Sequence, residues 1–282
     1  MALRDAAQQL GGMTSISTAL TLPVSAEHLV RAFGEHPGVE ALAVMGSHAR
    51  GDSGPYSDID LVRFTSDPGL ALPDDGTHVV ERRLVVVSTV HEDQLRMWFE
   101  QPELAVAFVA GIRAAQVLVD HGFLALWQER ARCFVWNASL RARADRWVSA
   151  ELVGWAEEVH KGLEGLRRGG DVGRLLNARH GCTFGLSRIV QVHRRVLTEG
   201  DNDFYDALDA ALGPDSRWAR LRRTAFGVQD PSGRAPTLPE QVRAGLELYV
   251  VTAELVASAV QPEHRAVIDH TVGQILALDS QL

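Results

Sequence analysis

Residues 45–61 read MGSHARGDSGPYSDIDL, and this stretch decides the fold around it. The apolar run that leads into it, residues 39–45, predicts a short buried strand. A loop rich in Gly, Ser, Asp and Pro follows, and residues 58–64 predict a second strand. Because side chains alternate along a strand, Asp58 and Asp60 are expected on one face of the sheet.

The residue types in this stretch suit phosphate and metal chemistry. Gly46 lets the backbone approach a ligand closely, and its N–H, with the hydroxyl and amide of Ser47, can cradle phosphate oxygens. Arg50 adds a planar cation that suits phosphate. Asp58 and Asp60, about 7 Å apart on a strand, can share one hard cation such as Mg²⁺ or bridge two. The stretch therefore predicts transfer of a nucleotidyl group from a nucleoside triphosphate.

The order of these residues resembles a known signature. Gly46-Ser47, a spacing of ten residues and Asp58-Ile59-Asp60 are similar to the motif of the DNA polymerase β-like nucleotidyltransferase superfamily. The helical second half and the loosely matching residues 116–122 resemble the branch of aminoglycoside and lincosamide nucleotidyltransferases. The resemblance, specific over residues 39–65, implies the fold, Mg²⁺ and a nucleoside triphosphate donor, and it leaves the acceptor open.

The sequence departs from the superfamily at the third carboxylate. The superfamily usually places this acid on a later strand, and the matching position here is Leu84. The nearest acids are Glu81 and Glu92, and Glu81 has the opposite strand parity to Leu84. Three alternatives follow: Glu81 serves through the register of a hairpin, the site holds one metal firmly, or catalysis is degraded.

A second candidate group lies on a predicted helix over residues 149–166. Glu157 and Lys161 are four residues apart, so they share one helical face. Lys161 is the only lysine among the 28 Lys and Arg residues. The pair resembles a helix of the aminoglycoside nucleotidyltransferases, which implies that Glu157 is the general base and Lys161 a triphosphate ligand. An exposed ion pair is the plain alternative, with Glu158 as an alternative base and Glu151 a more distant one.

Composition and charge limit the binding partners and the cellular compartment that we expect for this protein. A net charge of −8 and the lack of a basic block argue against tight binding of nucleic acid. We find no signal peptide and no apolar run long enough to span a membrane, so a cytoplasmic protein is expected. Cys133 and Cys182 lack partnered spacing and are interpreted as buried thiols. His48, within the loop after the first strand, is expected to be solvated.

These patterns predict an α+β protein in which a small mixed sheet with helices is followed by a helical bundle. We expect an N-terminal extension over residues 1–24, with a short helix at residues 3–10. A nucleotidyltransferase domain is expected over residues 25–137, and a helical acceptor-binding domain over residues 138–282.

The functional hypothesis is a Mg²⁺-dependent transferase that moves a nucleoside monophosphate, AMP from ATP, to a hydroxyl of a small molecule. The acidic balance of the chain suits a cationic acceptor such as an aminoglycoside. The alternative is a nucleotide-binding regulatory or protein-modifying member of the same fold with degraded or altered catalysis, which Leu84 at the acidic position favours. The oligomeric state is left open.

Overall fold

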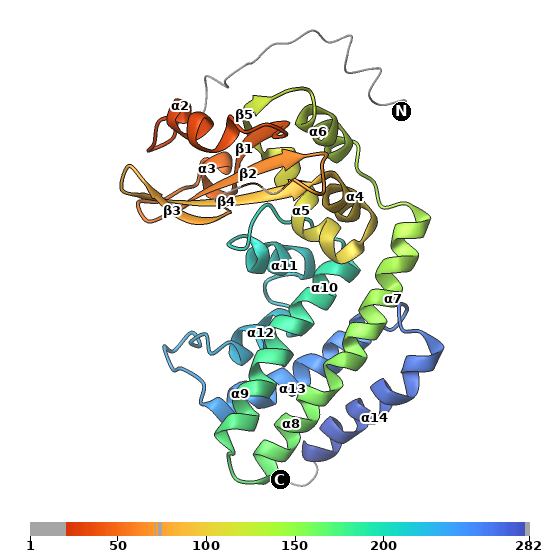
Figure 1. Ribbon diagram of the computed structural model, residues 1–282. Helices are drawn as coiled ribbons and strands as arrows, with labels where there is room; N and C mark the ends of the chain where they lie inside the picture. Colours follow the sequence, from red (N-terminus) through yellow and green to blue (C-terminus); the bar gives the residue numbers. More distant parts are fainter. Residues whose placement is uncertain (1–20, 71, 73–74, 280–282) are drawn as a thin grey trace. The chain divides into compact units, whose positions relative to one another are not determined.

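The computed structural model describes residues 21–70, 72 and 75–279 (Figure 1). The helix expected over residues 3–10 lies outside the described residues. The chain forms two compact units that interleave in sequence. The first unit extends to Val135 and also contains Leu197–Asp201, whereas the second contains Trp136–Val196 and the chain from Asn202 onward.

A mixed sheet of five strands forms the centre of the first unit. Its strands are β1 (Ala41–Met45), β2 (Ile59–Thr65), β3 (Gly76–Val80), β4 (Arg83–His91) and β5 (Gln116–Asp120), in the spatial order β3-β4-β2-β1-β5. β2 and β4 pair in parallel, and the other neighbours are antiparallel. β5 is an edge strand and lies within residues 116–122, the segment that loosely matches the nucleotidyltransferase branch.

The helices of the first unit are α2 (Ala26–Leu29), α3 (Gly46–Arg50), α4 (Glu92–Glu100), α5 (Pro102–Ala114) and α6 (Leu124–Arg132), and a π-helical turn, Val30–Gly34, continues α2. Leu29 of α2 and Phe33 of the π-helical turn pack on one face of the sheet, in a buried cluster with Ile59 and Val85. Because strand side chains alternate, the neighbouring residues of β2 and β4 point to the other face.

One local expectation about the first unit was wrong. The chain after β1 forms α3 instead of continuing as a loop, and the amides of Gly51 and Asp52 both donate to the Ser47 carbonyl. Gly51 has a φ of +82° and ends this helix, since glycine adopts the left-handed conformation without steric cost.

The second unit is helical. Its helices are α7 (Ala138–Gly154), α8 (Ala156–Arg167), α9 (Val172–His180), α10 (Leu186–Arg194), α11 (Phe204–Leu212), α12 (Arg217–Ala225), α13 (Leu238–Leu255) and α14 (Pro262–Asp279), with a π-helical turn, Gly181–Gly185, between α9 and α10. The buried helix α13 packs against α12, α9 and α8. The predicted α+β class, a mixed sheet with helices followed by a helical part, is confirmed (Figure 1).

Two further observations bear on the sequence expectations. Cys182 is buried, but Cys133 is exposed, because it lies just beyond the end of α6, where its thiol donates to a carboxylate oxygen of Glu129. Of the helices within the described ranges, none has the length and apolarity needed to cross a bilayer.

Candidate active site

Gly46 and Asp60 are brought together by the pairing of two strands. Met45 lies opposite Asp60 in the antiparallel register of β1 and β2, so Gly46 follows beside the Asp60 carboxylate. Gly46 has a φ of +64°, and a Cβ built on it would lie 2.0 Å from Oδ2 of Asp60. Only glycine fits here, because any side chain would displace the carboxylate.

The two aspartates form the acidic centre of the site. Asp58 precedes β2, and Asp60 is the second residue of that strand. Burial raises the pKa of the Asp60 carboxyl above its usual range, and repulsion from Asp58 adds to the rise. Arg50 and His48 oppose this shift, so both of these residues lie within electrostatic range of Asp60. The structure therefore gathers Asp58, Asp60, Gly46 and Arg50 at one place.

His48 differs from the sequence expectation. Its side chain is 8% exposed, so it is buried and not solvated. The helical turn of α3 explains the difference, since it directs this ring inward where a loop would leave it in water. Among the described residues, Nε2 of His48 finds no hydrogen-bond partner. A buried polar atom without a partner is costly in a folded protein and marks a place where a ligand or water binds.

Arg50 contacts two other parts of the first unit. Its Nε lies 3.2 Å from Oδ2 of Asp52, and its Nη1 donates to the carbonyl oxygen of Glu199 over 3.2 Å. The guanidinium side chain is only 10% exposed. Arg50 thus connects the turn after β1 to the distant segment Leu197–Asp201, a contact that the sequence did not suggest.

The face of β4 that should carry the third acid is apolar. Asp60 lies beside Val86 in the parallel register of β2 and β4, and Leu84 shares the face of Val86. Leu84 is 50% exposed. Glu81 does not complete the pair of aspartates: it occupies the β3–β4 turn with a φ of +48°, and its carboxylate lies 2.9 Å from Nδ1 of His28.

Glu157 and Lys161 lie on α8 of the second unit. Nζ of Lys161 lies 3.0 Å from Oε1 of Glu157 and 2.7 Å from Oε1 of Glu158. The Glu157 side chain is 76% exposed, whereas that of Glu158 is 19% exposed. Hydrogen bonds that the ammonium donates to these carboxylates, first to Glu158 and then to Glu157, raise the pKa of Lys161. The sequence prediction of a shared helical face therefore describes the local arrangement, and the catalytic roles remain predictions.

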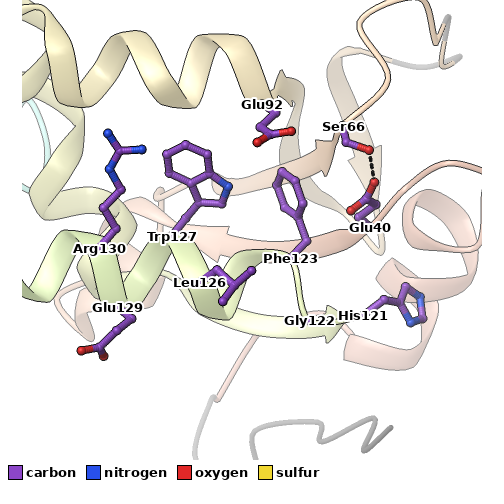
Figure 2. Close-up of a pocket in the computed structure, with 10 residues that line it drawn as sticks. All are labelled: Glu40, Ser66, Glu92, His121, Gly122, Phe123, Leu126, Trp127, Glu129 and Arg130. Carbon is purple, nitrogen blue, oxygen red and sulfur yellow. Dashed lines mark hydrogen bonds between the residues drawn. The ribbon is translucent and has the colours of Figure 1, made fainter. Parts of the chain in front are cut away.

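A separate cavity of about 540 Å³ opens at the other end of the strands (Figure 2). Glu40, which precedes β1, and Ser66, which follows β2, lie on its wall, with Phe123 and Trp127 of the α6 region. Five residues of β1, roughly 16 Å of strand, separate this end from Gly46.

The carboxylates of this cavity are already engaged. Figure 2 shows the hydrogen bond from the Ser66 hydroxyl to Glu40. Glu92 pairs with Arg96, and Glu129 pairs with Arg132. The charges of Glu92 and Glu129 are thus compensated within the first unit, whereas Glu40 only accepts a hydrogen bond from a neutral hydroxyl. The cavity carries none of the residues expected from the motif.

The aspartate pair fits a divalent cation. Among the described residues, neither Asp58 nor Asp60 forms an ion pair, and hard divalent cations prefer carboxylate oxygens. The space beside Asp60 is kept free by Gly46, and the unpartnered Nε2 of His48 lies in the same region. Within the described ranges no three His, Cys, Asp or Glu side chains meet closely enough to hold one ion. Two protein carboxylates, completed by substrate oxygens and water, match the binding of Mg²⁺.

Part of the first unit matches a known domain family. Residues 27–103, which include β1, α3, β2 and β4, match the family model of the nucleotidyltransferase domain. The chain is also similar to the solved structure of a nucleotidyltransferase-like protein from Exiguobacterium sibiricum, at 13% identity and a TM-score of 0.48, over 89% of this chain and 77% of that chain. No curated protein matches the chain. The first unit therefore carries a nucleotidyltransferase domain, and general nucleotidyl transfer is the class of activity that this domain supports.

Two features near the aspartates were missed in the sequence. The burial of His48 had no signal in the sequence, since the residue lies among Gly, Ser and Asp that predict a loop. The placement of the segment Leu197–Asp201 in the first unit was not predicted. The only local signal was the acidic residues Glu199 and Asp201. Acidic residues are equally typical of a solvated loop, so they did not indicate a role near the aspartates.

Proposed function

We propose that this protein transfers AMP from ATP to a hydroxyl group of a small molecule, with Mg²⁺ held by Asp58 and Asp60. The observation that carries this proposal is the approach of Gly46 to the Asp60 carboxylate, directly after a buried strand. A positive φ at Gly46 and the absence of a Cβ leave room there for a phosphate and an ion.

The residues of the α3 turn bind the triphosphate in this proposal. The N–H of Gly46 and the hydroxyl and N–H of Ser47 donate to phosphate oxygens. Arg50, whose charge reaches Asp60, adds a cation on the same side of the sheet. When bound, the divalent cation neutralises charge on the α-phosphate and the leaving pyrophosphate.

The transfer itself is a single displacement at phosphorus. The acceptor oxygen forms a bond to the α-phosphorus, the bond from that phosphorus to the β-bridging oxygen breaks, and pyrophosphate leaves with the electron pair. The acceptor proton goes to a carboxylate, which we assign to Glu157, and Lys161 donates to the triphosphate. The antibiotic-like identity of the acceptor rests on the resemblance noted above and on the net charge of −8, which suits a cationic molecule.

Pyrophosphate release tests the proposed function. The full chain is incubated with ATP, Mg²⁺ and a panel of hydroxylated acceptors that includes aminoglycosides. The Asp58→Ala variant is expected to release pyrophosphate at least about a hundredfold more slowly, because it loses one of two cation ligands. Asp93→Asn, which removes an exposed carboxylate of α4, serves as the control and should match the wild type. Equal rates for Asp58→Ala and the wild type would rule out the mechanism.

The role of Lys161 is tested by a conservative change. Lys161→Arg is expected to raise the KM for ATP about fivefold or more, because a guanidinium cannot reproduce the point contact of an ammonium with phosphate. Arg167→Lys on the same helix, where Arg167 pairs with Glu164, is the matched control and should be silent. A silent Lys161→Arg would assign Lys161 to a surface ion pair with Glu157 and Glu158, whose loss has little effect on stability.

A second candidate function is nucleotide binding without turnover. It is favoured by the apolar Leu84 and Val86 on the strand that carries an acid in the superfamily. Calorimetry would separate the two candidates. Binding of Mg²⁺-ATP, with no pyrophosphate released on any acceptor of the panel, would support a binding or regulatory protein.

A further inference from the structure

β4 places no acidic side chain beside Asp60. Val86 lies beside Asp60, and Leu84 follows on the same face, so this strand offers no carboxylate to the aspartate pair. A divalent cation bound by only two protein carboxylates gains affinity from any further negative charge nearby.

The segment Leu197–Asp201 belongs to the first unit although the helices on both sides of it belong to the second. Thr198 is 6% exposed and anchors it: its backbone N–H donates to the carbonyl oxygen of Val106 over 3.0 Å, and its hydroxyl donates to the same oxygen over 3.4 Å. These two hydrogen bonds hold the segment on α5, the helix in which a Cβ built on Gly111 would lie 2.9 Å from Cε of Met45, at the end of β1.

Arg50 fixes the same segment from the side of the aspartates. Its Nη1 donates to the carbonyl oxygen of Glu199, and a Cβ on Gly200 would lie 2.6 Å from that nitrogen. The absence of a side chain at Gly200 thus allows the backbone to pack directly on the guanidinium. Arg50, in α3, acts here as a positioning residue for the segment.

Asp201 follows Gly200 and is the last residue of the segment. Asp201 is thus next in the chain to the backbone that packs on Arg50. Repulsion from its carboxylate adds to the rise in the pKa of Asp60, after the larger effects of burial and of Asp58. Among the described residues Asp201 forms no ion pair, and it does not combine with the two aspartates into a three-ligand metal cluster. Its influence on the site is therefore that of a nearby charge and not of a direct ligand.

We propose that Asp201 supplies the third negative charge of the cation site, brought there by the Leu197–Asp201 segment that Arg50 and Thr198 hold on the first unit. The inference rests on the proposed function, since it takes Asp58 and Asp60 as the cation ligands. Asp201 strengthens cation binding through space, and it takes the place of the acid that β4 lacks. Asp201 lies more than a hundred residues after Asp60 in the sequence.

Direct binding of Mn²⁺, followed by the electron paramagnetic resonance of the free ion, tests this inference without catalysis. Asp201→Asn is expected to weaken Mn²⁺ binding by the full chain about fivefold to twentyfold, the effect of one charge several ångströms from a divalent ion in a partly hydrated site. Asp201→Glu restores the charge and should recover most of the affinity. Asp93→Asn, an exposed carboxylate paired with Arg96, should bind Mn²⁺ as the wild type does.

Ionic strength separates a through-space charge from other effects. The ratio of affinities between the wild type and Asp201→Asn should shrink as salt is raised from about 0.05 M to about 1 M, because exposed charges are screened. A ratio that does not change with salt would overturn the inference. Equal binding by Asp201→Asn and the wild type, or an equal loss in Asp93→Asn, would also overturn it.

A second variant, Asp60→Asn, is measured in the same way. It distinguishes failure of the inference about Asp201 from failure of the proposed function. Loss of Mn²⁺ binding in Asp60→Asn, with wild-type binding in Asp201→Asn, would leave the proposed site intact and remove only Asp201 from it. Wild-type binding in Asp60→Asn would contradict the proposed cation site itself, and the inference about Asp201 with it.

Discussion

A Gly46→Ala variant is expected to lose nucleotidyl transfer by about a thousandfold or more. The new Cβ would lie 2.0 Å from Oδ2 of Asp60, closer than any contact a real Cβ makes, so the carboxylate must move. The same change strains the backbone, since alanine is disfavoured at a φ of +64°. The variant therefore displaces both the Asp60 carboxylate that holds the cation and the backbone N–H that binds phosphate. Both groups stabilise the transition state in the proposed reaction.

Gly51→Ala is the matched control for the Gly46 variant. Gly51 also has a positive φ, +82°, but no atom lies within 4 Å of a Cβ built on it. Both variants should lose about 1 kcal/mol of unfolding free energy through backbone strain, and only Gly46→Ala should lose activity. Pyrophosphate release and urea denaturation of both variants measure the two effects. Comparable activity in the two would show that the space beside Asp60 is not used.

An Asp75→Asn variant is expected to be destabilised by about 3 kcal/mol, the low end of the range for breaking a buried ion pair. Nη2 of Arg63 lies 2.5 Å from Oδ1 of Asp75, and the Arg63 side chain is fully buried, whereas that of Asp75 is 52% exposed. The exposure of Asp75 lowers the expected cost, because water screens its charge. Urea denaturation measures the change, and Asp93→Asn, which breaks an exposed pair with Arg96, should alter stability by less than about 1 kcal/mol.

Because of the Asp75 carboxylate, the free energy of unfolding is also expected to depend on pH. Partial burial acts to raise the pKa of Asp75, but hydrogen bonds from Arg63 and Thr89 outweigh it, and the folded pKa is lowered. A lowered folded pKa contributes stability that is present above the unfolded value, near 3.8, and is lost as the pH falls through the folded one. The stability difference between wild type and Asp75→Asn should therefore shrink as the pH falls below 3.8 toward the lowered folded pKa. A difference that stays constant with pH would contradict the ion pair.

Much of the candidate active site could be predicted because the sequence patterns that indicate it span only a few neighbouring residues. The strand before Gly46 and the alternation around Ile59 follow from hydrophobic pattern and strand geometry, which act over a few residues. Pro102 at the start of α5 is another local signal, since proline favours the first turn of a helix.

Other features depend on contacts that no local pattern encodes. Glu81 and Arg82 both have positive φ in the β3–β4 turn, a geometry usually signalled by Asn or Gly, so the sequence did not indicate where the Glu81 carboxylate points. Arg50 reaches a backbone carbonyl of Glu199, and a carbonyl is present at every residue. The position of the Leu197–Asp201 segment thus follows from tertiary structure alone.

The return of this segment to the first unit also constrains how the protein can form during synthesis. Chain leaving the ribosome up to Val135 contains every strand of the sheet but lacks Thr198 and the contacts that Glu199 and Gly200 make with Arg50. Helices α7 to α10 are made before these residues appear. Domains generally fold in order as they emerge, but here the first unit is completed only after much of the second has been translated. A fragment that ends at Val135 therefore contains the whole sheet but lacks the segment that packs on Arg50 and α5.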